Sequence, residues 1–249
     1  MLKPKAPVPE DETLEPFGQG RRLWVFQKKL GYRFSLDAVL LAGLTELRTG
    51  DRVVDLGAGC GIISLILACR FPHCCLLGVE SQSTLASLAE RNALLNGLAG
   101  QIEIMAEEMQ NLPRQFPPRS FAVVVSNPPY RPLGSGRLNP MAERAIARHE
   151  LQGSLEMVAQ AAGYLLPPGG RLALIYPAWR LVHLCSLLRS YHLEPKSMRL
   201  IHSRSGDEAK LVWMEARKDG REELKVLPPL MVYRDLGGYT AEMEEIFNF

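Results

Sequence analysis

The segment Arg52-Val-Val-Asp-Leu-Gly-Ala-Gly-Cys-Gly61 decides the fold of this chain. Its first five residues are rich in valine and predict a buried strand, and the apolar residues over 62–70 predict a helix. Between the two, Gly57, Gly59 and Gly61 would let a ligand lie against bare backbone. A strand, a glycine-rich turn and a helix in this order are typical of α/β folds that bind ligands at the carboxyl ends of their strands.

The segments that follow repeat this alternation of strands and helices. Apolar runs bounded by turn residues predict further strands over 75–79, 102–105, 121–125 and 171–176, and a closing hairpin over 197–203 and 208–216. Apolar residues at helical spacing predict helices over 82–96, within 140–166 and over 178–190. The order implies an α/β, Rossmann-like fold: a mostly parallel seven-stranded sheet with a C-terminal antiparallel hairpin and helices on both faces.

The residues ahead of the glycine turn divide into three parts. Residues 1–16 mix prolines with acidic side chains, and we expect a flexible arm there. The stretch 21–34 alternates basic with large apolar residues, which favours a hairpin with its turn near Lys29–Gly31. Ser35 is suited to cap a helix that runs through Leu47.

These assignments describe a single domain over 17–249, with the hairpin and helix in 17–50 and the core with a C-terminal extension in 51–249. Of the 249 residues, 47% are apolar and 22% are charged, as in ordinary soluble globular proteins. No apolar run approaches the ~20 residues that span a bilayer. The first residues lack the apolar core of a signal peptide.

The cysteines indicate the cellular compartment, and the net charge limits the kinds of partner that the protein can bind. The five cysteines form no Cys-x-x-Cys pair and no zinc spacing, so we expect reduced thiols, a cytoplasmic protein and no structural metal. The net charge of +2 is nearly neutral, so any nucleic-acid interface must come from local basic clusters. We expect a monomer or a weak homodimer.

A second polar stretch, Ser126-Asn-Pro-Pro-Tyr130, follows the strand over 121–125. Its prolines fix the backbone and donate no N–H, which makes the turn stiff. The Asn127 amide oxygen and the Pro128 carbonyl could each accept one hydrogen of an exocyclic amine. Tyr130 could stack on the ring that bears the amine, which is worth ~1–3 kcal/mol per base. The competing interpretation is a proline-stiffened loop with a solvated tyrosine.

Two acids accompany the glycine turn. Asp55 immediately precedes it, and Glu80 ends the next strand, where an acid can accept hydrogen bonds from ribose hydroxyls. The spacing is G-x-G-x-G, which differs from the G-x-G-x-x-G of dinucleotide folds, and the lysine of a triphosphate-binding loop is absent from it. The pattern therefore favours a nucleoside-containing ligand other than a dinucleotide or a triphosphate.

Together these motifs resemble a known family. Val53-Val-Asp-Leu-Gly-Ala-Gly-Cys-Gly61 resembles the cofactor motif of class I S-adenosylmethionine-dependent methyltransferases, and Asn127-Pro-Pro-Tyr130 resembles their amino-group-methylating motif. Three further segments are similar to the tRNA1(Val) adenine-N6 methyltransferase family: 31–42, 145–150, and the closing Pro228-Pro-Leu-Met-Val-Tyr233 with Gly238-Tyr-Thr-Ala-Glu-Met243. The resemblance covers about residues 20–249.

The resemblance implies a cofactor, a substrate and a set of site residues. The cofactor is S-adenosylmethionine, and the substrate is a tRNA, methylated on the adenine 3′ of the anticodon (position 37) of a valine tRNA. The residues implied to bind the cofactor are Asp55, Gly57, Gly59, Gly61, Glu80 and Asn127, with Glu107 or Glu108 near its adenine. Those implied to act on the target amine are Asn127, Pro128 and Tyr130.

Basic residues after the second motif are candidates for contact with the tRNA. They are Arg131, Arg137, Arg144 and Arg148, for which a solvated helix face is the competing interpretation. Tyr32 and Phe34 could cover the cofactor or the base, or could belong to the core of the first hairpin.

Other functions stay open on the sequence alone. Glutamine methyltransferases of release factors share Asn-Pro-Pro-Tyr, but they carry a helical domain ahead of the cofactor motif. Methylation of DNA or rRNA is a second alternative, and a DNA enzyme would usually need an added recognition domain. A non-catalytic RNA-binding module is a third. The glycine spacing disfavours a nicotinamide-dependent oxidoreductase.

Overall fold

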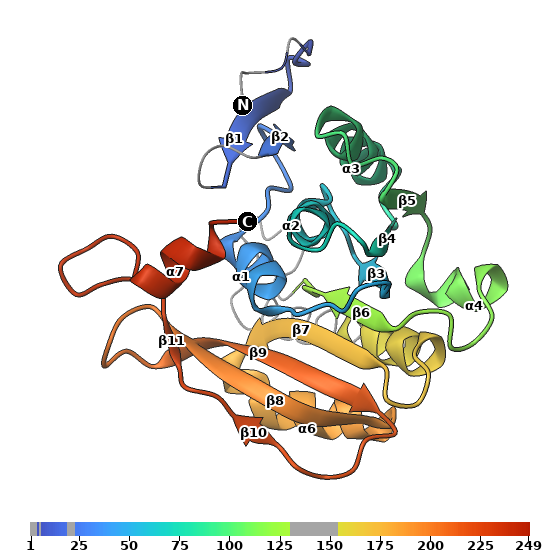
Figure 1. Cartoon of the computed structure of the whole chain (residues 1–249), viewed down its shortest axis with the longest axis vertical. Helices are drawn as coiled ribbons and strands as arrows, with labels where there is room; N and C mark the ends of the chain where they lie inside the picture. Colours follow the sequence, from blue (N-terminus) through green and yellow to red (C-terminus); the bar gives the residue numbers. More distant parts are fainter. Residues whose placement is uncertain (1–3, 5, 19–22, 130–153) are drawn as a thin grey trace, which may run out of the picture.

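One large sheet runs through the part of the chain that the computed structural model describes, residues 4, 6–18, 23–129 and 154–249 (Figure 1). Its strands are β3 Arg52–Leu56, β4 Cys75–Glu80, β5 Ile102–Ala106, β6 Val123–Ser126, β7 Arg171–Pro177, β8 Leu193–His202, β9 Ala209–Lys218, β10 Lys225–Val226 and β11 Leu230–Met231. The spatial order is β10-β8-β9-β7-β6-β3-β4-β5, with β11 also paired to β8. Only the β7–β9 and β8–β9 pairs of this sheet are antiparallel.

Helices cover both faces of the sheet and enclose two apolar cores. One face carries α1 Leu36–Leu44, α2 Ile62–Arg70 and α3 Ser83–Leu95. The other carries α4 Leu112–Gln115, a helix described over 154–165, and α6 Leu181–Ser190, which follows the short η2 Ala178–Arg180. Within β3, Val53 faces the first core and Val54 the second, and both side chains are fully buried. Strands that are buried on both faces have continuous apolar sequences, and this pattern allowed them to be predicted from the sequence.

The central elements confirm the expected α/β fold closely. The structure gives β3 and α2 the expected bounds, and β4, β5 and β7 differ by one residue at their ends. Helix α1 begins after Ser35 as predicted, but it ends at Leu44 and not at Leu47. The helix stops there because Thr45 turns extended and its hydroxyl donates to the Leu41 carbonyl at 2.7 Å.

The expected number of seven strands is wrong, because two short strands extend the sheet beyond β8. Strands β10 and β11 both pair in parallel with β8. They cover an edge that would otherwise present unpaired backbone groups. Pro228 and Pro229 separate them and cannot donate to a ladder, so neither strand grows long enough to be recognised in the sequence.

The expectation for the N-terminal hairpin is also corrected. Its first strand, β1 Glu12–Phe17, lies largely within the segment expected to be a flexible arm, and it pairs antiparallel with β2 Leu23–Lys28. The two strands are joined by residues 18–22, so the turn is not at Lys29–Gly31. Glu12, 4% exposed, forms ion pairs with Lys28 across the hairpin and with Arg91 of α3. One of the acids that suggested a flexible arm, Glu12, is therefore buried and holds the hairpin to α3.

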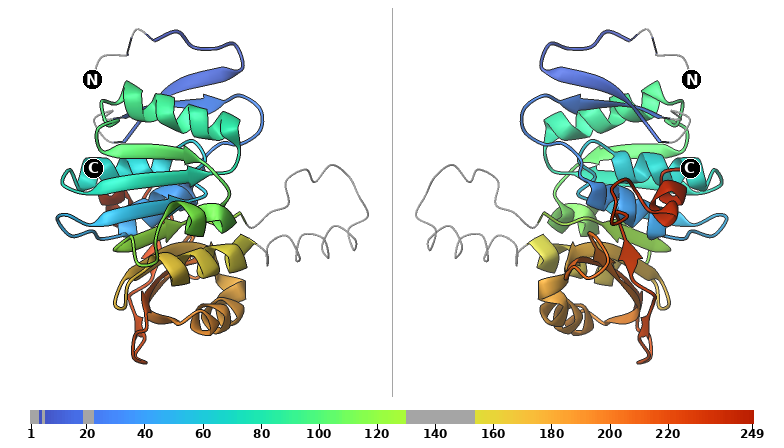
Figure 2. Two further views of the ribbon diagram at one scale, coloured as in Figure 1. Left: turned by 90° about the vertical axis from the view of Figure 1, so that its right-hand side faces the viewer. Right: turned by 90° about the vertical axis from the view of Figure 1, so that its left-hand side faces the viewer.

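Two asparagine side chains of helix α3 form hydrogen bonds with the backbone of β2. Figure 2 shows the hairpin lying over this helix. The Asn92 amide accepts from the Phe26 N–H at 2.8 Å and donates to the Phe26 carbonyl at 3.1 Å. Asn96 makes the same pair of bonds to Trp24, each at 2.9 Å. Four helical residues rise ~6 Å and two strand residues ~6.6 Å, so the two spacings match. Asn92 also donates to the Cys60 carbonyl at 2.9 Å and so joins the hairpin to the glycine turn.

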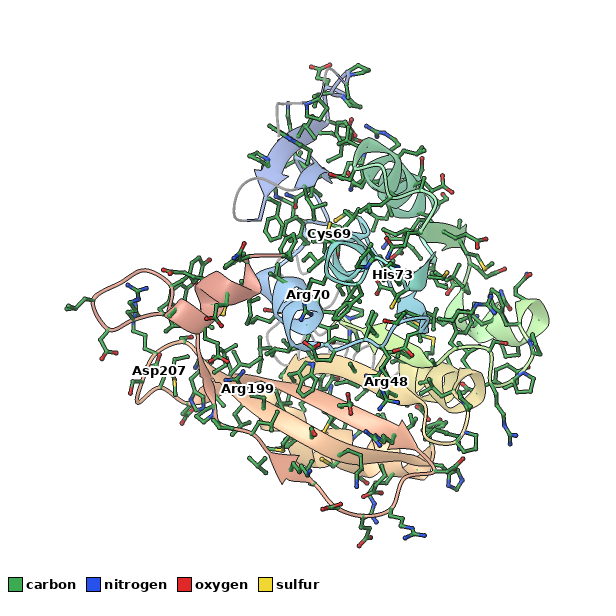
Figure 3. The ribbon with its side chains drawn as sticks, viewed as in Figure 1. Arg48, Cys69, Arg70, His73, Arg199 and Asp207 are labelled. Atoms are coloured by element: carbon green, nitrogen blue, oxygen red, sulfur yellow. The ribbon has the colours of Figure 1, made fainter. Side chains whose placement is uncertain are left out.

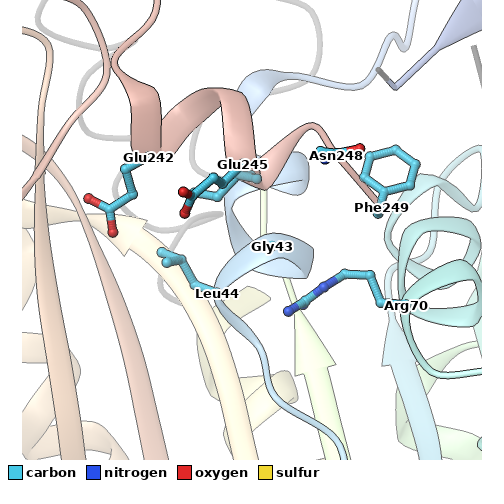
Figure 4. A pocket seen from close by; sticks show the side chains of 8 residues that line it. Gly43, Leu44, Arg70, Glu242, Glu245, Asn248 and Phe249 are labelled. Carbon is cyan, nitrogen blue, oxygen red and sulfur yellow. The ribbon is translucent and has the colours of Figure 1, made fainter. Parts of the chain in front are cut away.

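The C-terminal helix α7 Ala241–Ile246 packs against α1, on the face of the sheet that carries α1, α2 and α3. The contact is close at Gly43, where an added Cβ would lie 2.5 Å from Ile246 Cγ2. A pocket beside this contact is lined in part by Glu242, Glu245 and Arg70 (Figure 4). The Arg70 guanidinium already donates to the Ala42 and Thr45 carbonyls and to Glu46, so its hydrogen-bond donors are engaged within the protein.

Candidate active site

The glycine turn lies at the carboxyl edge of the sheet, between β3 and α2. The N–H groups of Gly57 and Ala58 both donate to the Val79 carbonyl at the end of β4, at 2.9 and 3.0 Å. Gly57, Gly59 and Gly61 have φ angles of 78°, 57° and 83°. This left-handed backbone favours glycine, and the internal hydrogen bonds hold the turn in one shape before any ligand arrives.

Tyr32 lies directly over this turn. A Cβ added at Gly59 would be 2.5 Å from the Tyr32 hydroxyl oxygen, so the phenol occupies the space that a side chain would take. The residue as a whole is 38% exposed, but its hydroxyl is desolvated against the turn, which raises the pKa of Tyr32. Phe34 instead packs edge-on against Phe17, with ring centroids 5.2 Å apart. The two aromatic residues paired in the sequence thus separate into one at the glycine turn and one in the hairpin core.

Glu80 closes the glycine turn from β4. The residue is 6% exposed, and its carboxylate accepts from the Gly59 N–H at 2.9 Å and from the Gln82 N–H at 3.0 Å. Each oxygen therefore already has one backbone donor and keeps further acceptor capacity. A charged acceptor with free lone pairs at this place suits neighbouring hydroxyl groups of a ligand.

Asp55 is fully buried beneath the turn. Its Oδ2 accepts from the Ser64 hydroxyl at 2.9 Å, and its Oδ1 has no partner among the described residues. Burial raises the pKa of Asp55 to about 7, the Ser64 hydrogen bond opposes that shift, and the charge of Glu80 adds to it. A pKa of about 7 means that the neutral and ionised forms of this carboxyl group are similarly populated near neutral pH.

Asn127 follows β6, the strand next to β3. Its Oδ1 is buried and without a partner in the part of the chain that the structure describes. The preceding Ser126 is fully buried and donates its hydroxyl to the Leu56 carbonyl at 2.7 Å. This bond ties the start of the second motif to the start of the glycine turn. Pro128 is buried and Pro129 is exposed.

The two candidate acids after β5 have different surroundings. Glu107 is half-buried and accepts from the Glu108 N–H and from the Asn111 amide, both at 2.9 Å. These bonds, that of Asn111 first, lower the pKa of Glu107. Its own N–H donates to the Glu80 carbonyl at 3.1 Å, which sets it beside Glu80. Glu108 is exposed.

The structure therefore brings Asp55, the three glycines, Glu80, Glu107, Asn127 and Pro128 to one edge of the sheet. Tyr130, Arg131, Arg137, Arg144 and Arg148 lie outside the described residues. Ser126, Ser64 and Asn92 connect the motifs to each other, and this role was not predicted from the sequence. Small polar residues in apolar runs were the available signal, since such residues are buried with partners.

No three His, Cys, Asp or Glu side chains gather as metal ligands would within the described residues. In the same residues, no helix combines the length and apolarity needed to cross a membrane.

Comparisons with known proteins agree with this architecture. The family described as the methyltransferase small domain matches residues 35–176. A tRNA1(Val) (adenine(37)-N6)-methyltransferase of Porphyromonas gingivalis is 32% identical over 203 residues, 79% of this chain and 79% of that protein. A protein of the same name from Bacteroides fragilis is 25% identical over 94% of this chain and 98% of its own length.

Among solved structures, that of a predicted O-methyltransferase from Agrobacterium tumefaciens matches with a TM-score of 0.70. It is 24% identical and covers 85% of this chain and 95% of its own, a likeness that concerns the fold.

Proposed function

The chain belongs to the methyltransferase small domain family of class I S-adenosylmethionine-dependent enzymes, and we propose that it methylates the N6 amine of adenine 37 in a valine tRNA. The observation that carries the proposal is the buried Oδ1 of Asn127, which has no hydrogen-bond partner among the described residues. Leaving such an acceptor unsatisfied costs ~1–3 kcal/mol. An exocyclic amine that enters beside it supplies the missing donor.

The residues around the glycine turn fit the cofactor. Gly57 offers bare backbone where an added Cβ would meet the Met109 methyl at 3.4 Å, and Glu80 keeps acceptor capacity for the ribose hydroxyls. Glu107, which lies beside Glu80, is the better candidate for the cofactor's adenine than the exposed Glu108. When bound, S-adenosylmethionine supplies a methyl group made electrophilic by its sulfonium.

Asn127 and Pro128 orient the target amine. The Asn127 side chain accepts one N–H and the Pro128 carbonyl the other, while Tyr130 stacks on the base. Adenine N6 is a poor nucleophile because its lone pair is shared with the ring. Hydrogen bonds that strengthen as the nitrogen becomes tetrahedral lower the barrier selectively. An amide has no useful basicity, so Asn127 does not take the proton, which leaves to water or to a carbonyl.

The tRNA assignment rests on the relatives of that name and on the accessibility of loop bases. An unpaired base in an anticodon loop can enter a pocket at a smaller unstacking cost than a base in a duplex. The basic residues Arg131, Arg137, Arg144 and Arg148 are candidates for contacts to the flanking strand. The substrate would place the enzyme in the cytoplasm.

Total tRNA from a strain that lacks the gene provides the test. After incubation with the protein and labelled S-adenosylmethionine, we expect label in N6-methyladenine, located in the anticodon loop by mass spectrometry of nucleosides and fragments. The Asn127→Ala protein is the negative control. Label on a protein glutamine, on duplex DNA or on guanine would contradict the proposal and favour one of the alternatives.

A further inference from the structure

Arg180 is the only buried arginine among the described residues, with 7% of its surface exposed. One of its terminal nitrogens donates to the Tyr176 hydroxyl at 3.0 Å. The guanidinium carbon lies 5.6 Å from the centre of the Tyr176 ring and 5.5 Å from that of Trp179. Arg180 takes part in none of the ion pairs among the described residues.

Three other arginines that are largely covered each have a carboxylate partner. Arg171 pairs with Asp51, Arg199 with Glu242 and Arg70 with Glu46. Arg70 and Arg199 are labelled in Figure 3. A buried cation is costly unless an anion compensates it. The two aromatic rings and one hydroxyl around Arg180 offset this cost only in part, so its surroundings are suited to an anion from outside the described protein.

The position of Arg180 indicates what that anion belongs to. Strands β6 and β7 are parallel neighbours, with Ser126 opposite Leu174, so their carboxyl ends share one edge. Asn127 follows β6, and η2, which contains Arg180, follows β7. The glycine turn and Glu80 belong to β3 and β4, on the opposite side of β6. Arg180 therefore stands on the side of Asn127 that faces away from the cofactor residues.

Two further side chains in the same segment suit a nucleic-acid strand. Trp179, beside Arg180, is 73% exposed, and an indole in solvent is a platform for base stacking. His183 Nε2, on the first turn of α6, is buried and has no partner among the described residues. A neutral imidazole with its hydrogen on this nitrogen can donate to an anion.

We propose that Arg180 binds a backbone phosphate of the RNA strand next to the target adenine, and that Trp179 stacks on the adjoining base. The inference rests on the proposed function and names the part of the protein that receives the strand. A guanidinium presents several donors in one plane, which matches the oxygens of a phosphodiester better than a point charge does. The phosphate supplies the negative charge that no described residue gives Arg180, and the exposed indole receives the neighbouring base.

The test uses the full-length protein and an anticodon stem-loop RNA in which single phosphates are replaced by uncharged methylphosphonates. For the wild type, we expect one replacement next to the target adenine to weaken binding about tenfold or more. Arg180→Gln should weaken binding of the unmodified RNA by a similar factor and lose its sensitivity to that replacement. Trp179→Ala should weaken binding about tenfold. Affinity for S-adenosylmethionine, measured by calorimetry, should stay within twofold in both variants.

Arg199→Gln is the matched control, since it also removes a largely covered arginine but one that is paired within the protein. It should lower thermal stability and leave the methylphosphonate profile unchanged. Should Arg180→Gln not fold, Arg180→Lys retains the charge without the planar geometry and should give an intermediate loss.

The outcomes separate this inference from the proposed function. If the wild type methylates the stem-loop but no phosphate beside the target affects its binding, the inference is overturned while the function stands. The same holds if Arg180→Gln keeps the wild-type profile. If the wild type neither binds nor methylates the RNA, both are overturned.

Discussion

The two polar turns at the carboxyl edge of the sheet are built in opposite ways. In the glycine turn, the N–H groups of Gly57, Gly59 and Gly61 are all paired within the protein, and Glu80 accepts a backbone donor on each oxygen. At the ends of β6 and β7, Asn127 Oδ1 lacks a partner and Arg180 lacks a carboxylate within the described residues. The difference teaches that the half proposed to bind the cofactor is shaped by its own hydrogen bonds, whereas the half proposed to receive the substrate keeps groups that a ligand would complete.

The largest effect that separates the two halves is expected from Asn127→Ala. Asn127 is proposed to act on the nucleophile, so its loss should reduce the single-turnover rate by about 10²–10³-fold. Affinity for S-adenosylmethionine should change less than twofold, because the glycine turn does not depend on this side chain for its hydrogen bonds. Asn248→Ala is the control, since this exposed asparagine lies in the C-terminal segment. A rate for Asn127→Ala within a few-fold of wild type would remove the contrast between the halves.

Asp55 is the point where the glycine turn resembles the end of β6, because its Oδ1 also has no partner among the described residues. Its pKa is raised from 3.8 to about 7, so the folded state favours the neutral form. The stabilisation from this group is complete below about pH 4 and is lost as the pH rises to about 7. Relative to Asp55→Asn, the wild type should lose stability on the order of 1–4 kcal/mol over that range.

Urea unfolding of both proteins at pH 4, 5.5 and 7.5 measures this difference. Titrating groups that do not interact with Asp55 contribute equally to the two proteins and cancel in the comparison. Parallel pH profiles for wild type and Asp55→Asn would mean that the pKa of Asp55 is the same in the folded and unfolded states. The prediction of a raised pKa would then be wrong.

A smaller effect on cofactor affinity is expected from Glu80→Ala. The loss of a charged acceptor should cost about 1.5–3 kcal/mol of binding free energy for S-adenosylmethionine. Glu103→Ala is the matched control, because Glu103 is an exposed acid on the neighbouring strand β5. Calorimetry on both variants decides the matter: equal affinities would mean that the turn holds the cofactor without its acid.

The predictions that came from local pattern are the ones that the structure confirms most closely. Strand β3 and helix α2 have the expected bounds, since a strand buried on both faces and a helix after a glycine turn each leave a continuous signal in the sequence. The family resemblance carried by residues 53–61 and 127–130 is confirmed by the comparisons. The roles of the single site residues stay predictions.

Failures of the sequence analysis occurred where a residue's meaning depends on distant partners. Glu12 looks like one of several acids in a loose arm, and it is an anchor only because Lys28 and Arg91 come to meet it. Strands β10 and β11 exist because β8 offers them an edge.

The sequence by itself determined the order of the central strands and helices from β3 to β9, the glycine turn with Asp55 and Glu80, and the proline-rich turn at Asn127. Periodicity, glycine spacing and proline stereochemistry are local properties, and they are written in neighbouring residues. Only the tertiary structure decided that Ser126 ties the two turns together and that the amides of Asn92 and Asn96 bond to the backbone of β2. It also decided that Arg180 is buried without a carboxylate partner among the described residues. Burial and hydrogen-bond satisfaction depend on residues far away in the chain, which meet only when the sheet and its helices close around them.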